Sequence, residues 1–67
     1  MRTYGKLRER IKAKFGTIGA FSTAMGKNRG TISNKLNGIA SWTQAEIELA
    51  CRLLGITVEE VGDYFFY

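Results

Sequence analysis

The chain has 67 residues, 45% of them hydrophobic and 24% charged, with a net charge of +4; this balance predicts one globular domain over residues 1–67 and excludes a disordered chain. It contains no histidine and one cysteine, Cys51, which excludes an intramolecular disulfide, the usual zinc ligand sets and Cys–His or Ser–His–Asp catalysis, so we expect neither an enzyme nor a cofactor or metal site. No apolar run approaches the about 18 residues that cross a bilayer, and the first residues lack a signal-peptide core, so we expect a cytoplasmic protein with no membrane partner.

Capping residues and glycines divide the chain into five predicted helices, at about 4–15, 18–25, 29–36, 44–54 and 58–65. Each of the first four is followed closely by a glycine, where helices commonly end in a left-handed residue: Gly16, Gly26, Gly38 and Gly55.

Helix starts are marked as clearly. Thr17 and Asn28 are N-cap candidates for the second and third helices. Thr43–Glu46 and Thr57–Glu60 both have the Thr-x-x-Glu pattern of a capping box, each flanked by an apolar pair that could form a hydrophobic staple.

Apolar residues recur at three- and four-residue spacing along every predicted helix, and no segment alternates with the period of a strand. The stripes would share one core: Tyr4, Leu7, Ile11 and Phe15; Phe21 and Met25; Ile32 and Leu36; Ile47, Ala50, Cys51 and Leu54; Val58, Val61 and Phe65. The predicted fold is all-α, a compact five-helix bundle.

Residues 17–36 carry the most functional information. They form a short predicted helix, a glycine-containing turn and a second short helix, which is the pattern of a helix-turn-helix. In that motif the turn fixes the second helix across the first, so that the second helix can enter the major groove of DNA.

The sequence FSTAMGKNRGTIS, at 21–33, resembles the helix-turn-helix of lambda-type repressors and Cro proteins, and KLNG at 35–38 is similar to the end of their recognition helix. Three later segments resemble, in order and spacing, the small Cro or modulator-of-repression proteins of Gram-positive temperate phages: WTQAEI at 42–47, LLGI at 53–56 and YFF at 64–66. The resemblance covers about Tyr4 to Phe66 and implies a lambda repressor-like DNA-binding domain.

Two positions depart from the family pattern. Ser22 stands where the family usually has alanine, and it fits if its hydroxyl bonds to a carbonyl one turn earlier. Lys27 stands where the turn is usually apolar, and it could lay its stem on apolar surface and send its amine outward to a phosphate.

The base-reading positions implied by the family, aligned on Gly26 and Ile32, are Asn28, Arg29, Gly30, Ser33 and Asn34. Helical geometry gives a similar set, because inward Ile32 and Leu36 leave Arg29, Gly30, Ser33 and Asn34 on the opposite face. Arg29 could pair with guanine, Asn34 with adenine and Ser33 with either kind of base, while Gly30 would permit close approach. The alternative is that Arg29 and Asn34 belong to an ordinary solvated helix surface.

Phosphate contacts are expected beside this helix, where they would fix its register on the duplex. Thr17 caps free N–H groups at the start of the second helix, which form an anion site. The expected contacts are Thr17, Lys27, Lys35, Asn37, Ser41, Trp42 and Thr43. For Trp42 the competing interpretation is a staple to Ile47, and both can hold if the ring packs inward while its N–H reaches a phosphate.

Charge is distributed unevenly along the chain. Up to Ala40, nine bases face one acid, a net of +8; from Ser41 onward one base faces five acids, a net of −4. A basic half suits a polyanion, because each neutralised phosphate releases counterions, although these residues could equally form a solvated helix face. The bases of the first helix fit DNA contact less well, since that helix usually crosses behind the recognition helix: Lys6, Arg8, Arg10, Lys12 and Lys14.

The chain ends in four aromatic residues, 64–67, which cannot all face one small core. We expect Phe65 in the core and Tyr64, Phe66 and Tyr67 on a surface for a homodimer or another phage regulator; the rival is a monomer whose tail folds back over the first helix. The predicted function is a sequence-specific double-stranded DNA-binding transcriptional regulator. The alternative is an interaction module that binds a phage repressor. The aromatic and Gly-x-x-Gly platforms of RNA-binding modules are absent.

Overall fold

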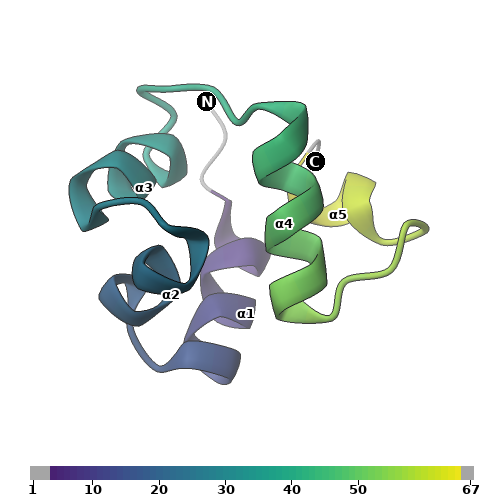
Figure 1. Cartoon of the computed structure of the whole chain (residues 1–67). Coiled ribbons are helices and arrows are strands. Elements are labelled where there is room, and N and C mark those ends of the chain that lie inside the picture. The colour runs from purple at the N-terminus through teal and green to yellow at the C-terminus, as the bar shows by residue number, and fades with distance from the viewer. Residues whose placement is uncertain (1–3, 66–67) are drawn as a thin grey trace.

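The structure, a computed structural model, describes residues 4–65, and this part of the chain contains five helices and no strand. The helices are α1 (Gly5–Phe15), α2 (Ile18–Met25), α3 (Arg29–Leu36), α4 (Gln44–Leu54) and α5 (Val61–Phe65) (Figure 1). The predicted all-α fold is confirmed, and the first four helices match their predicted bounds to within one residue. No helix in the described part is long and apolar enough to cross a membrane.

Three of the predicted N-caps account for where α2, α3 and α4 begin. The Thr17 hydroxyl accepts the N–H of Ala20, and the Asn28 side chain accepts the N–H of Thr31. At α4 the Thr43 hydroxyl accepts the N–H of Glu46, whose carboxylate accepts the N–H of Thr43 in return. Each cap satisfies donors that a helix N-terminus otherwise leaves unpaired.

The predicted start of the last helix is wrong. Residues 58–60 form a turn, and α5 begins only at Val61. The Glu60 carboxylate accepts the Thr57 N–H at 3.2 Å and the Thr57 hydroxyl at 3.1 Å, but the Glu60 N–H donates to the Thr57 carbonyl and not to its hydroxyl, so only one half of the predicted capping box forms. Val58, predicted to be in the core, is instead 82% exposed.

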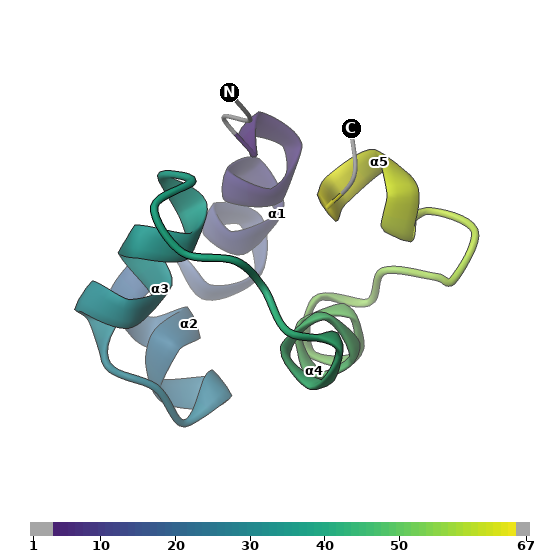
Figure 2. The same cartoon turned by 90° about the horizontal axis from the view of Figure 1, so that it is seen from above.

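Helix α1 is the centre of the arrangement: it packs against α2, α4 and α5, while α3 packs on α2 (Figure 2). The core consists of residues from the predicted stripes together with Ile56, which belongs to none of them. The buried hydrophobic residues are Leu7, Ile11, Phe21, Met25, Ile32, Leu36, Ile47, Ala50, Leu54, Ile56 and Phe65. Phe65 is therefore a core residue, as predicted.

Two arginines of α1 brace the C-terminal ends of other helices. Arg8 Nη2 donates to the Leu36 carbonyl at 2.8 Å, at the end of α3. Arg10 donates to the carbonyls of Leu54 and Gly55, at the end of α4, at 2.9 and 3.1 Å. The last carbonyls of a helix lack intrahelical donors and carry partial negative charge, so a cation is favourable there. These two bases of the first helix therefore support the fold.

Candidate nucleic-acid interface

The connection between α2 and α3 is a tight turn over residues 26–28. Gly26 ends α2 in the left-handed conformation, with φ of 74°, and the Lys27 N–H donates to the Ser22 carbonyl. Ser22 is 1% exposed, and its hydroxyl donates to the Ile18 carbonyl at 2.8 Å. The expectation that Ser22 fits by bonding one turn back is confirmed.

Helix α3 has a buried face and an outward face, as predicted. Ile32 and Leu36 are 0% and 1% exposed. The side chains predicted to contact bases lie away from these anchors, and we call them the α3 outer surface: Asn28, Arg29, Gly30, Ser33 and Asn34. All of them are exposed except Ser33, which is half-buried at the margin.

Two members of the α3 outer surface also have local structural contacts. The Asn28 Oδ1 accepts the Thr31 N–H at 2.7 Å, so its amide nitrogen is the part left to face a ligand. The Arg29 stem lies across the first turn of α2, with Cδ 3.8 Å from the point where a Cβ on Gly19 would stand. The Arg29 side chain therefore lies beside the N-terminus of α2.

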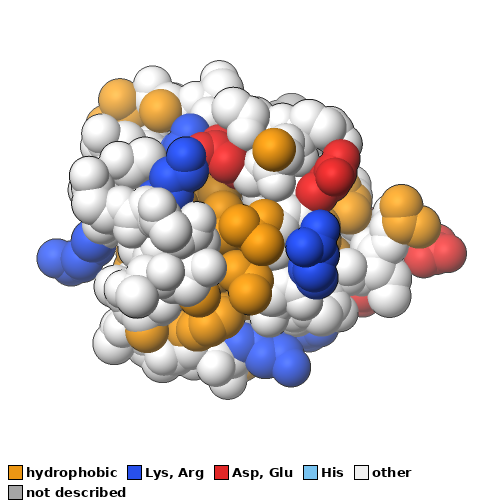
Figure 3. All heavy atoms as spheres, in the orientation of Figure 1, with side chains coloured by type: hydrophobic (Ala, Val, Ile, Leu, Met, Phe, Trp, Pro, Cys, Tyr) orange, Lys and Arg blue, Asp and Glu red, His pale blue; other side chains and the backbone are white. Residues whose placement is uncertain are grey.

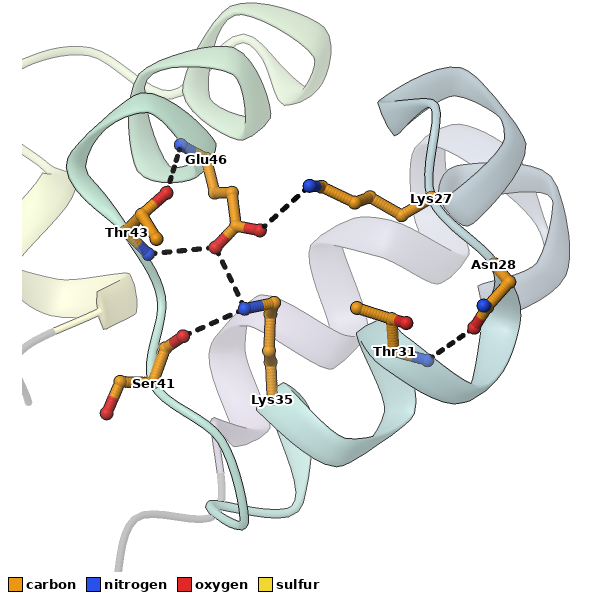
Figure 4. Close-up of polar contacts among 7 residues, drawn as sticks. All are labelled: Lys27, Asn28, Thr31, Lys35, Ser41, Thr43 and Glu46. Atoms are coloured by element: carbon orange, nitrogen blue, oxygen red, sulfur yellow. Dashed lines mark hydrogen bonds and ion pairs between the residues drawn. The ribbon is translucent and has the colours of Figure 1, made fainter.

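The prediction that Lys35 contacts a phosphate is contradicted by its burial. Lys35 is 7% exposed, and its Nζ lies 2.9 Å from both the Ser41 carbonyl and Oε1 of Glu46 (Figure 4). On α3 it stands beside Ile32 and Leu36 on the inward face, because position 35 follows Ile32 by three residues. Its ammonium therefore joins α3 to the following loop and to α4.

Lys27 does not extend freely outward either. Its Nζ lies 3.5 Å from Oε2 of Glu46, with 43% of its side chain exposed. The Glu46 carboxylate thus forms ion pairs with two lysines, one from the turn and one from α3, and also accepts a hydrogen bond from the Thr43 N–H (Figure 4).

Glu46 has the most strongly altered acidity in the described part of the chain. Burial by itself would raise the pKa of this carboxyl, but the Thr43 N–H and the hydrogen bond and positive charge of Lys35 outweigh it and lower the pKa to about 2. The carboxylate therefore stays ionised across the physiological pH range.

We call Glu46 and its partners Lys27, Lys35 and Thr43 the Glu46 cluster. Acid is expected to reduce the stability that this cluster contributes over a defined pH range. Because the Glu46 pKa of about 2 in the folded state lies below its ordinary 4.5, the stabilisation is complete above pH 4.5 and is lost as the pH falls towards 2. Denaturant unfolding across this window measures the loss, and Glu46→Gln is the control. A variant with the same pH dependence as the wild type would contradict this assignment.

The remaining predicted phosphate contacts lie in different settings. Thr17 is exposed at the start of α2. Asn37 and Ser41 are exposed, but the Asn37 Oδ1 accepts Arg8 Nη2 at 2.7 Å and the Ser41 carbonyl accepts Lys35. Thr43 is exposed while its hydroxyl and N–H form the capping box.

For Trp42 the suggested outward N–H is contradicted. The indole Nε1 is buried and has no hydrogen-bond partner among the described residues. The ring packs edge-on against Tyr4 and Phe65, with centroids 6.4 and 5.3 Å away. Trp42 is therefore a packing residue that attaches the loop before α4 to the core.

The aromatic tail is described only in part. Tyr64 is half-buried against the core, with Lys6 Nζ 5.8 Å from its ring centroid, and α5 packs on α1. Phe66 and Tyr67, the other predicted partner residues, lie outside the described residues.

Two features were missed by sequence reasoning. Glu46 was recognised only as a capping residue, because no spacing rule links it to Lys27 and Lys35. Ile39, which follows α3, is 74% exposed, and its N–H donates to the Asn34 carbonyl. The exposure of Ile39 could have been predicted from the sequence, because this apolar residue lies outside every helical stripe.

The five helices and the polar outer surface of α3 define a small all-helical domain. The chain belongs to the family described as "Protein of unknown function (DUF739)", and the match covers residues 2–67. No curated protein matches the sequence significantly.

Proposed function

We propose that the protein is a sequence-specific double-stranded DNA-binding transcriptional regulator of the Cro or repressor kind found in phages and prophages. In this proposal α2 and α3 form a helix-turn-helix, and α3 enters the major groove. The observation that carries it is the α3 outer surface, which is held outward by the buried anchors Ile32 and Leu36.

Rigid presentation of α3 supports base reading. An eight-residue helix is too short to be stable alone, so its support must come from outside. Asn28 caps its start, Arg8 binds its last carbonyl, and Lys35 ties it to Glu46. Base contacts require side chains held in fixed positions by such a framework.

The chemistry of the exposed groups fits base edges. Arg29 can donate two parallel hydrogen bonds to guanine, and Asn34 can both donate to and accept from adenine. Gly30 would let the helix approach the groove floor. Arg29 also lies beside the N-terminus of α2, where Thr17 caps a helix end that favours anions, so a backbone phosphate is its second possible ligand.

Selection of bound sequences from a random duplex pool tests the proposal. The expected result is an enriched motif, bound with an affinity that falls steeply as salt rises. No detectable binding to any duplex at low salt would contradict it.

The second candidate is an interaction module that binds a phage repressor, and two observations favour it. Lys35 and Lys27 are paired with Glu46, so Arg29 is the one cation in residues 27–36 without an ion pair in this structure. Figure 3 shows an apolar strip between α2 and α4, two helices whose half-buried hydrophobic residues are Ile18, Leu49, Cys51 and Leu53. Co-purification with a co-expressed phage repressor, together with no duplex binding, would favour this function.

A further inference from the structure

Two lysines share the Glu46 carboxylate, but the structure holds them very differently (Figure 4). Lys35 Nζ is 2.9 Å from Oε1, and its side chain is 9% exposed. Lys27 Nζ is 3.5 Å from Oε2, and its side chain is 43% exposed. The sequence alone predicts the same role, a phosphate contact, for both lysines.

The Lys35 ammonium cannot leave Glu46 without a loss of stability. Its ammonium also donates to the Ser41 carbonyl at 2.9 Å, so withdrawing it would leave a buried carboxylate and a carbonyl short of a partner. Breaking a buried pair is strongly unfavourable because it uncovers a desolvated charge. Lys35 is therefore a permanent part of the connection between α3 and α4.

Lys27 can leave, because Glu46 remains satisfied without it. The carboxylate would keep the Thr43 N–H at 2.8 Å and Lys35 at 2.9 Å. The contact with Lys27 is long and partly solvated, and such ion pairs contribute little to stability. A stronger or less screened anion could therefore compete for this ammonium.

Lys27 also stands where a competing anion would arrive. It directly precedes Asn28 and Arg29, the first two residues of the α3 outer surface. A duplex that places base edges against that surface brings its backbone past the α2–α3 turn, and a side chain with 43% exposure can rotate towards it.

We propose that Lys27 is an exchangeable cation, which pairs with Glu46 in the free protein and transfers to a backbone phosphate when a duplex binds, while Lys35 stays on Glu46. This inference rests on the proposed function. Glu46 then has two roles. It fixes α3 through its ion pair with Lys35, and it pairs with the Lys27 ammonium until a backbone phosphate replaces Glu46 as the partner of Lys27.

The salt dependence of binding to a mixed-sequence DNA duplex tests the exchange. A plot of log affinity against log salt concentration has a negative slope, and each phosphate neutralised by a cation increases the magnitude of that slope by about 0.9. Lys27→Gln is expected to reduce this slope by about that amount, whereas Arg52→Gln, which removes an equal charge from an exposed position on α4, leaves it unchanged. Melting curves check that both variants are folded.

A direct readout follows the lysines themselves. Incorporation of carbon-13-labelled lysine leaves every ammonium donor in place and gives each lysine side chain its own NMR signal. On addition of duplex the Lys27 signal is expected to shift in the wild type and to be absent in Lys27→Gln.

The outcomes separate the two proposals. A wild type that binds duplex with a steep salt slope, together with an unchanged slope in Lys27→Gln and a Lys27 signal that does not move, overturns the exchange and leaves the proposed function standing. A wild type that binds no duplex at low salt overturns both.

Discussion

Replacing Glu46 with alanine is expected to lower the free energy of unfolding by about 3–5 kcal/mol, the usual cost of leaving a buried charge without its partner. Lys35, 7% exposed, would lose its carboxylate, and α4 would lose its capping box. For a domain of this size that loss corresponds to a fall in Tm of more than about 10 °C.

Thermal melting followed by circular dichroism measures this effect. Glu48→Ala is the matched control, because Glu48 lies on the same helix but is exposed and bonds only to Gln44 among the described side chains. Glu46→Leu combined with Lys35→Met should recover part of the lost stability, since an apolar pair can replace a buried ion pair. Equal Tm values for Glu46→Ala and Glu48→Ala would show that the cluster does not stabilise the fold.

Replacing Asn34 with alanine is expected to reduce discrimination between the selected duplex and a mixed-sequence duplex by about 1–3 kcal/mol, the range for one bidentate base contact. Tm should change little, because the Asn34 side chain is exposed, and its carbonyl, which accepts the N–H groups of Ile39 and Ala40, is kept in the variant. The variant therefore separates recognition from folding.

Competition binding with the two duplexes at one salt concentration gives the measurement. Thr23→Ala serves as control, since Thr23 lies on the exposed side of α2 and its hydroxyl donates to the Gly19 carbonyl at 3.1 Å. Undiminished discrimination in Asn34→Ala would remove this residue from the base-reading set.

The sequence predicted the features that depend on neighbours along the chain. Helix stripes, the caps at Thr17 and Asn28 and the outward direction of Asn34 follow from local spacing, and the structure has them. Thr57–Glu60 shows the limit of that approach, because it has the pattern of Thr43–Glu46 but closes as a turn, with its hydroxyl donating to the carboxylate.

Features that depend on residues far apart could not be predicted in the same way. Helical spacing places Lys35 on the inward face of α3, but it does not identify Glu46 as its partner, because the two residues meet only after the chain has passed through an irregular loop. Likewise, Arg8 reaches Leu36 across 28 positions. The net charge of the basic half therefore counted cations that the folded protein uses internally.

The supports of α3 are attached almost entirely to its inner side and its two ends. Leu36, Lys35 and the Leu36 carbonyl bound by Arg8 hold α3 in place, whereas Gly30 has no side chain and the Asn34 side chain is exposed. An outward position such as Asn34 can therefore be substituted without rebuilding the scaffold beneath it, whereas Asn28, which caps α3, cannot.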